Sequence, residues 1–323
     1  MVKEIDVFAP AYNEAAHIGT TIGSIHDQDP NDKYHFNVLV LPNGCTDDTA
    51  SVASEAIANL PSHPSISFDV IKRPEASKTR AINFALGRCA SDVAMYIDTD
   101  VTFSERCFEQ VADEFADCTV QAAGPVPRNK IPPEIVGTYL GQILRVRQLY
   151  SDAAGPWPKP TGRLIAFRTA AIDALFEDTA ADDTWLINTI AQNHGWESIR
   201  VAQDASVYAT AQRNWLDYIQ QKSRYARGNE HLYEVFPELK RVLEEGRSFV
   251  NRHMRSRAEI EEVIAPIMEK ERLPMRLIDE LAVIGKICLD NAELMPHELV
   301  SARGKWKPVA STKVPTTQEE VSS

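Results

Sequence analysis

The sequence contains little cysteine and no long apolar run. Its 323 residues include five cysteines, and none of them form a Cys-x-x-Cys pair. An odd number without paired spacing argues against a disulfide framework or a zinc site, so we expect small core residues in a reducing compartment. No stretch approaches the roughly 18 apolar residues of a membrane-spanning helix, and the N-terminus has no apolar signal core. These absences predict a cytoplasmic protein, with peripheral contact at the inner face of a membrane left open.

Basic residues are outnumbered by acidic ones. The net charge is −12 and the pI is about 5.2, which argues against broad attraction to nucleic acid or anionic lipid. A hydrophobic content of 44% and a charged content of 25% are ordinary for a soluble protein. The length suits one large α/β domain with a C-terminal addition, or two domains. An acidic protein that handles an anionic nucleotide needs local cations or a metal ion.

A glycine-rich phosphate loop is missing after the first expected strand, residues 4–9. That place holds Tyr12-Asn13-Glu14. A dinucleotide dehydrogenase would need Gly-x-Gly-x-x-Gly there, and a nucleotidyltransferase would also need a glycine-rich loop. Both classes are therefore disfavoured.

Strands and helices are expected to alternate along the first third of the chain. Strands are predicted over 4–9, 36–41, 67–72 and 93–97, with helices over 14–27, 47–60 and 78–88. This order predicts a mostly parallel sheet with right-handed crossovers. Further elements follow: helices over 104–117, 135–150, 185–193, 215–232, 259–271 and 275–290, strands over 120–125, 164–167 and near Val201 and Val207, and a proline-rich loop over 155–162.

Asp98-Thr99-Asp100 follows the fourth expected strand, which is apolar. Two carboxylates at the end of a buried strand are costly unless they bind a hard cation such as Mg²⁺ or Mn²⁺. Open α/β sheets bind ligands at the carboxyl ends of their strands. A strand-end turn is the simpler alternative, since Asp is common in turns.

Polar motifs also follow the other strands. Pro10 to Glu14 can present an aromatic ring and backbone groups to a nucleobase, and Asn43 offers both donors and acceptors. Asp47 suits either a ligand contact or a helix cap. Lys78 begins a helix against the preference of the helix dipole, which a bound phosphate would explain.

Two later motifs carry charge. Asp182-Asp183 begins a helix, and a carboxylate near a nucleotide site suits a general base. Gln221, Arg224 and Gly228 share one face of the helix over 215–232, and arginine forks bind phosphate oxygens. A helix cap and a solvated basic helix are the respective alternatives.

In order and spacing these motifs resemble the family 2 glycosyltransferases, over roughly residues 4 to 232. The resemblance implies a GT-A fold over 1–232, which is a Rossmann-like, mostly parallel sheet flanked by helices. We expect a helical C-terminal extension over 233–310 and a disordered tail over 311–323. The matching motifs are Pro10-Ala11-Tyr12-Asn13-Glu14, Asn43-Gly44-Cys45-Thr46-Asp47-Asp48-Thr49, Lys78-Thr79-Arg80-Ala81-Ile82-Asn83, Asp98-Thr99-Asp100, Asp182-Asp183 and Gln221-Lys222-Ser223-Arg224-Tyr225.

The resemblance also implies roles for these residues. Asp183 would be the catalytic base, and Asp100 would coordinate Mg²⁺ or Mn²⁺. The acceptor side would include Asp182, Trp185 and Tyr225. The nucleotide-sugar donor, with UDP favoured, would be held by Pro10, Tyr12, Glu14, Asn43, Lys78, Asp98, Asp100 and Arg224.

The implied reaction is a metal-dependent, inverting transfer of a sugar to a hydroxyl of an unidentified glycan, lipid or small molecule. Pro42 stands where the family often has Asp, which weakens one ribose contact. Tyr225 stands where processive polymerases have Trp, and the spanning helices of those enzymes are missing, so transfer of one sugar or few is favoured. A retaining transferase and a non-catalytic sugar-nucleotide-binding protein are the alternatives.

Two weaker features complete the sequence. His194 and His231 are candidates for a further metal ligand, although structural roles are favoured. The basic segment over 240–257 suits anionic lipid, a solvated helix or a contact in a homo-oligomer.

Overall fold

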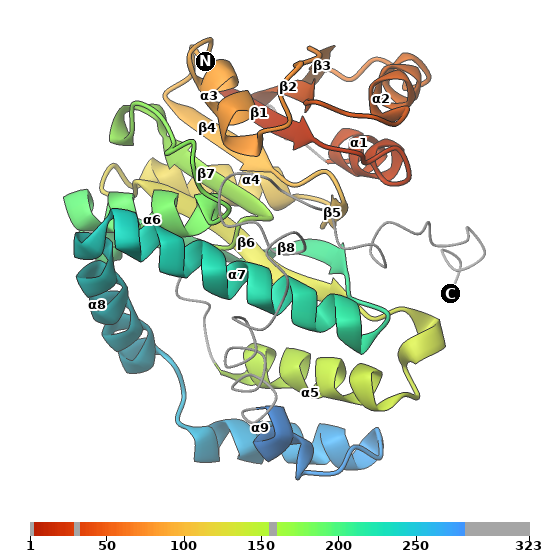
Figure 1. Cartoon of the computed structure of the whole chain (residues 1–323), viewed down its shortest axis with the longest axis vertical. Helices are drawn as coiled ribbons and strands as arrows, with labels where there is room; N and C mark the ends of the chain where they lie inside the picture. Colours follow the sequence, from red (N-terminus) through yellow and green to blue (C-terminus); the bar gives the residue numbers. More distant parts are fainter. Residues whose placement is uncertain (1–2, 29–32, 155–159, 282–323) are drawn as a thin grey trace.

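One mixed sheet of eight strands runs through the part of the chain that the structure describes (Figure 1). The computed structural model describes residues 3–28, 33–154 and 160–281. The strand order is β3-β2-β1-β4-β7-β6-β8-β5, and only β7 and β5 run antiparallel to their neighbours. The expected mostly parallel α/β sheet is therefore confirmed. The strands are β1 (Lys3–Ala11), β2 (Tyr34–Pro42), β3 (Ile66–Val70), β4 (Val93–Ile97), β5 (Val101–Phe103), β6 (Ala122–Lys130), β7 (Leu164–Arg168) and β8 (Ile199–Thr210).

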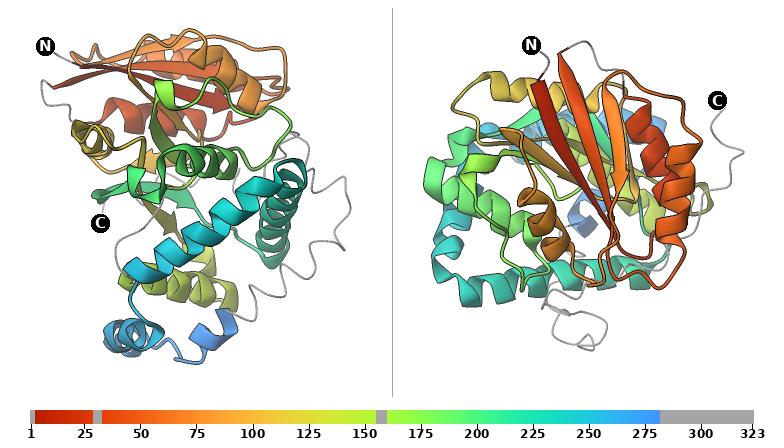
Figure 2. Two further views of the ribbon diagram at one scale, coloured as in Figure 1. Left: turned by 90° about the vertical axis from the view of Figure 1, so that its left-hand side faces the viewer. Right: turned by 90° about the horizontal axis from the view of Figure 1, so that it is seen from above.

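Helices cover both faces of this sheet, as the view from above in Figure 2 shows for β1, β2 and β3. Alternation along β1 explains this, because Val7 points into the cluster with α1 and α2, whereas Phe8 packs against α3 and α6. The helices are α1 (Ile18–His26), α2 (Thr49–Ala58), α3 (Lys78–Leu86), α4 (Cys107–Asp113), α5 (Tyr139–Ala153), α6 (Asp182–His194), α7 (Trp215–Val235), α8 (Pro237–His253) and α9 (Arg257–Lys270).

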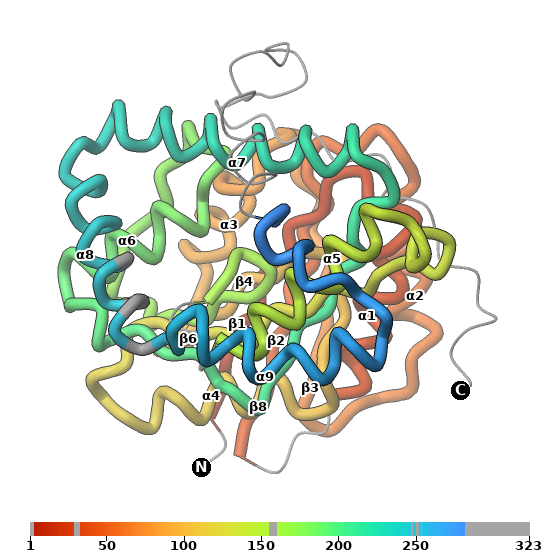
Figure 3. Tube along the Cα trace, turned by 90° about the horizontal axis from the view of Figure 1, so that it is seen from below, coloured from red at the N-terminus to blue at the C-terminus, as the bar shows by residue number. Residues whose placement is uncertain are grey.

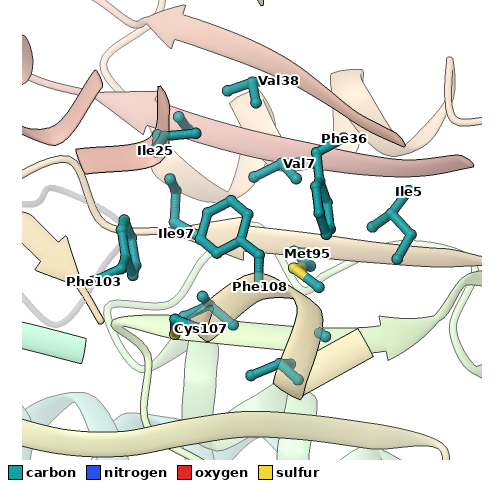
Figure 4. Packing of buried hydrophobic residues seen from close by; sticks show 14 of the residues in the cluster. Ile5, Val7, Ile25, Phe36, Val38, Met95, Ile97, Phe103, Cys107 and Phe108 are labelled. Carbon is teal, nitrogen blue, oxygen red and sulfur yellow. The ribbon is translucent and has the colours of Figure 1, made fainter. Parts of the chain in front are cut away.

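The larger hydrophobic cluster lies between the sheet and helices α1, α2 and α4 (Figure 4). Phe108 of α4 is its centre, with ring centroids 5.4 Å from Phe36 and 5.0 Å from Phe103, both edge to face. All three rings are buried, and such aromatic pairs add to the stabilisation that burial gives. This packing holds β2, α4 and β5 against the strands that carry the polar loops.

The C-terminal helices pack on the sheet-flanking helices. Ile260, Ile264 and Met268 of α9 pack against α5, beside which α9 lies in Figure 3. Trp196 donates an Nε1 hydrogen bond of 3.1 Å to the carbonyl of Val242, which ties α8 to the turn after α6. Across the described residues, no helix is long and apolar enough to cross a membrane.

Several sequence expectations differ from the structure. Strand β5 was not expected, and the strands expected near Val201 and Val207 form one strand, β8, that pairs with β6 on both sides of a register shift. Polar Gln203 and Asp204 interrupt the apolar pattern of β8 at the place where the register with β6 shifts. The helix expected over 14–27 begins only at Ile18, because a turn occupies the residues before it.

Some expectations fall outside the described residues. These are Cys288, most of the proline-rich loop, the helix over 275–290 beyond residue 281, and the tail over 311–323. Among the described cysteines Cys107 is buried as expected, but Cys118 is exposed, so it is not a core residue.

Candidate functional site

A pocket lies where β1, β2 and β4 end. It brings together seven of the eight residues expected to bind the donor, from loops that are distant in sequence. Parallel strands place their carboxyl ends at one edge of the sheet, which explains why these loops meet. The lining residues are Pro10, Tyr12, Glu14, Asn43, Ala76, Lys78, Asp98, Thr99 and Asp100.

The turn after β2 presents Asn43 to this pocket. Gly44 has φ +61°, and a Cβ on it would lie 2.5 Å from the backbone nitrogen of Ala76, so only glycine fits. Its N–H donates to the carbonyl of Arg73 at 2.8 Å. Asn43 is 2% exposed, and within the described residues its amide oxygen has no hydrogen-bond partner. A buried acceptor without a partner is costly, and a ligand donor in the pocket would satisfy it.

Asp47 does not line the pocket and instead holds two loops together. Its carboxylate accepts hydrogen bonds from the N–H groups of Ala15 at 3.2 Å and Thr49 at 3.0 Å. Of the two interpretations that the sequence left open, the structure favours the capping role for Asp47.

Lys78 lies between two carboxylates. Its ammonium group is 2.8 Å from Asp98 and 3.0 Å from Asp182. Burial opposes the charged form, but attraction by Asp182 and Asp98 holds the pKa of Lys78 well above its ordinary value. These ion pairs account for a cation in the first turn of α3, where the sequence suggested a phosphate instead.

Asp100 is a half-buried carboxylate beside Asp98. Burial and the neighbouring charge of Asp98 raise the pKa of Asp100 to about 6, against the attraction of Arg163. No cluster of three or more His, Cys, Asp or Glu side chains suited to a metal occurs in the described residues. Two carboxylates with a phosphate-bearing ligand nevertheless fit Mg²⁺ or Mn²⁺, which commonly take one or two protein carboxylates and complete their shell with phosphates and water.

A larger cleft of about 380 Å³ continues from the pocket. Lys78 and Asp98 line both, so the two spaces share a wall. Helices α5, α6 and α7 and the loop before β7 supply most of the cleft; Figure 1 shows α7 crossing in front of the sheet. The lining includes Asn129, Arg147, Gln148, Ser151, Thr161, Gly162, Arg163, Asp182, Asp183, Gln212, Gln221, Lys222, Arg224, Tyr225 and Asn229.

Asp183 lies in this cleft, in the first turn of α6. Its carboxylate accepts hydrogen bonds from the N–H groups of Gly162 at 3.2 Å and Thr184 at 2.8 Å. A Cβ on Gly162 would lie 3.0 Å from both Cβ and Oδ2 of Asp183, so the absence of a side chain at Gly162 leaves space for the carboxylate. The loop before β7 thereby fixes the position of a candidate base.

Helix α7 contributes Arg224 and Tyr225 to the cleft. Gly228 lies on the buried face of α7 against Ala181, which brings the helix close to the start of α6. Arg224 is therefore placed in the cleft and not in the smaller pocket with the other expected donor residues.

Trp185 is placed differently from our expectation of an acceptor-side residue. It packs against the hydrophobic cluster that contains Ala181, Leu232 and Leu239, and it does not line the cleft. His231 lies near the carbonyl of Asp178, at 3.2 Å, and lines neither space. His194 also lines neither.

Four residues that line the cleft were not predicted from the sequence: Arg147, Ser151, Thr161 and Arg163. Arg147 and Ser151 are four residues apart on α5, which places them on one face, although the helix expected over 135–150 ended before Ser151. Nothing in the sequence showed that this face points to the site. Arg163 and Thr161 flank Gly162, at the end of the proline-rich loop.

Comparisons with known proteins agree with this geometry. Residues 6–162 match the family model described as Glycosyl transferase family 2. Comparison with curated protein sequences gave no significant match. The chain resembles the solved mannosyltransferase PcManGT from Pyrobaculum calidifontis, in complex with GDP-Man and Mn²⁺, with 20% identity and a TM-score of 0.57 over 90% of this chain and 81% of that chain. It also resembles S. aureus TarS 1–349 in complex with UDP-GlcNAc, with 17% identity and a TM-score of 0.45 over 69% of this chain and 65% of that chain.

The family match covers β1 to the loop before β7, which includes the donor pocket and Asp98-Thr99-Asp100. The likeness to the mannosyltransferase extends the shared fold to most of the chain. Residues 6–162 match glycosyl transferase family 2, and the chain is a glycosyltransferase with the GT-A fold.

Proposed function

We propose that this glycosyltransferase moves a sugar from a nucleotide-diphospho-sugar to an acceptor hydroxyl, with inversion at the anomeric carbon. One observation carries the proposal. The pocket with the expected nucleoside contacts and the cleft with Asp183 share Lys78 and Asp98 in their walls. A donor that lies across this shared wall would place its sugar between the nucleotide site and a carboxylate base.

The residues of the pocket would bind the nucleotide. The loop from Pro10 to Glu14 and the amide oxygen of Asn43, which lacks a partner within the described residues, would contact the nucleoside, and Lys78 would contact the diphosphate. Asp98 and Asp100 would hold Mg²⁺ or Mn²⁺, which when bound supplies positive charge to the diphosphate. The mannosyltransferase neighbour was solved with a guanosine donor and TarS with a uridine donor. The favoured UDP-sugar therefore stays a proposal, and GDP-sugars belong in the same test.

The chemistry would be a single displacement. Asp183 accepts the proton of the acceptor hydroxyl as its oxygen forms a bond to the anomeric carbon. The bond from that carbon to the diphosphate oxygen breaks, and its electron pair leaves with the nucleoside diphosphate. Arg224 in the cleft would offset the negative charge that grows on the leaving group. Tyr225 and Asp182 would border the acceptor.

The architecture supports transfer of one sugar or few. Tyr225 is 42% exposed at the cleft, and no helix in the described ranges is suited to span a membrane. We also propose that residues 1–232 form the glycosyltransferase domain, that 233–310 form a helical extension, and that the protein acts in the cytoplasm.

A donor panel tests this function. Thermal-shift measurements with UDP- and GDP-sugars, with and without Mn²⁺, should find a donor that stabilises the chain more strongly with the metal. Proton NMR of the fresh product should then show the anomeric configuration opposite to that of the donor. Retention of configuration would exclude the single displacement, and absence of any donor binding would exclude the function itself.

A further inference from the structure

The cleft beside Asp183 carries an excess of positive charge. Its lining includes five cationic side chains but only three aspartates. With Lys78 paired to Asp98 and Asp182, the lining as a whole keeps a formal charge of +2. The whole chain has a net charge of −12, so this local excess contrasts with the rest of the protein. A concave site of one charge sign raises the local concentration of ligands of the opposite sign.

Arg147 has no carboxylate partner. Among the described residues its guanidinium group makes no ion pair and no hydrogen bond, although the residue is half-buried. Arg145, two residues before it on α5, instead forms an ion pair of 2.6 Å with Glu271, away from the cleft. Of these two arginines on α5, Arg145 is therefore paired with a carboxylate, whereas Arg147 lines the cleft.

Arg163 is the second arginine of this group. Its guanidinium donates to neutral oxygens, the carbonyl of Arg128 and the side chain of Asn129, both at 2.6 Å. Burial lowers the pKa of Arg163 against the attraction of Tyr225, Asp100 and Asp98, and repulsion by Arg147 acts in the same direction as burial. Neither guanidinium forms an ion pair within the described residues, and an anion that contacts both would relieve the repulsion between them.

Two hydroxyl groups complete the arrangement. Ser151 lies one helical turn after Arg147, and its hydroxyl has no hydrogen-bond partner within the described residues. The hydroxyl of Thr161 is buried and also lacks a partner there. Arginine forks with neighbouring hydroxyl donors suit the several oxygens of a phosphate or carboxylate group. The set Arg147, Ser151, Thr161 and Arg163 is called the α5 subsite below.

We propose that the α5 subsite binds an anionic group, a phosphate ester or a carboxylate, of the sugar acceptor. This inference rests on the proposed function and names the class of acceptor. Thr161 and Arg163 flank Gly162, whose N–H holds the carboxylate of Asp183. An acceptor anchored by its anion at the α5 subsite therefore presents a nearby hydroxyl to Asp183. The residues of the α5 subsite do not line the pocket that would bind the donor.

Matched acceptors test the proposal in the full chain. With the donor found by the panel and Mn²⁺, transfer would be compared for glucose, glucose 6-phosphate and glucuronate. Vesicles of phosphatidylcholine with and without phosphatidylinositol distinguish a lipid-borne phosphate from a soluble one. We expect at least one anionic acceptor to exceed its neutral counterpart at least tenfold in kcat/KM. Equal rates for all charged and neutral pairs would overturn the proposal.

Variants assign the effect to the subsite. Arg147→Gln should reduce the anionic preference about tenfold, mainly through KM, while donor affinity stays unchanged. Arg145→Gln, on the same helix but outside the cleft, should keep the wild-type preference. A preference that survives Arg147→Gln would contradict the assignment.

A binding measurement separates this proposal from the proposed function. Calorimetry with inorganic phosphate, in the presence of nucleoside diphosphate and Mn²⁺ to fill the donor pocket, should show binding that weakens about tenfold in Arg147→Gln. If no sugar nucleotide binds at all, the function fails, and phosphate binding by the free chain still tests the subsite. Equal phosphate affinity of wild type and Arg147→Gln would refute it.

Discussion

The ammonium group of Lys78 lies 3.0 Å from the carboxylate of Asp182, an ion pair that joins the first turn of α3 to the first turn of α6. Asp182 is followed by the candidate base Asp183, and Lys78 also pairs with Asp98 at the donor pocket. The pair therefore links the side of the site that would bind the donor to the side that would activate the acceptor.

Replacing Lys78 by Gln should destabilise the protein and weaken donor binding. Asp98 and Asp182 would then lie close together without their shared cation. Breaking a fully buried pair costs about 3–5 kcal/mol; because the side chains of Lys78 and Asp182 are 21% and 13% exposed, we expect about 2 kcal/mol in urea unfolding. Arg80→Gln on the same helix is the control, since its surface pairs with Glu75 and Glu177 should matter little. Equal effects of both variants would argue against a central role for Lys78.

Asp183→Asn should reduce turnover at least about a hundredfold, because the amide cannot accept the acceptor proton. Donor affinity, measured by calorimetry, should stay within a few-fold of wild type, since Asp183 lies in the cleft and not in the donor pocket. Asp173→Asn, at an exposed position before α6, serves as the control. Unchanged kcat in the Asp183 variant would remove it from the chemistry.

Gly162→Ala should lower kcat about tenfold with little effect on donor binding. The new Cβ would lie 3.0 Å from Oδ2 of Asp183 and displace the carboxylate, and small displacements of catalytic groups are costly. Gly23→Ala provides a matched comparison, because no atom lies within 4 Å of its added Cβ. The two variants should differ in kcat, measured under saturating donor and acceptor. A normal rate for Gly162→Ala would show that this contact does not position the base.

The pH dependence of stability should report Asp100. Its pKa of about 6 in the folded protein lies above the ordinary value of 3.8, so the folded state binds the proton more tightly than the unfolded state. The metal-free protein should therefore gain stability as the pH falls through 6 toward 4, by at most about 1.4 kcal/mol per pH unit. Urea unfolding of wild type and Asp100→Asn across this range checks the sign. Parallel pH profiles would show that the pKa of Asp100 is not raised.

The correspondence between sequence and structure depends on the element. The first four strands and the polar loops after them were predictable, because buried parallel strands are continuous apolar runs and their carboxyl ends share one edge. Strand β5 could not be predicted, because a strand of three residues is too short to show an alternating apolar pattern. Trp185 illustrates another limit. Its position next to Asp182-Asp183 suggested that it borders the acceptor, whereas in the folded chain its ring packs against a hydrophobic cluster.

Within the site, sequence patterns alone identified the candidate loops, including Asp98-Thr99-Asp100 and Asp182-Asp183. Local patterns suffice to locate these loops, because the ends of strands and the starts of helices can be recognised in the sequence. Only the tertiary structure decided that Lys78 joins Asp98 to Asp182, and that Arg147 faces the cleft while Arg145 pairs with Glu271. Such pairings depend on distances between segments far apart in the chain, which packing alone sets.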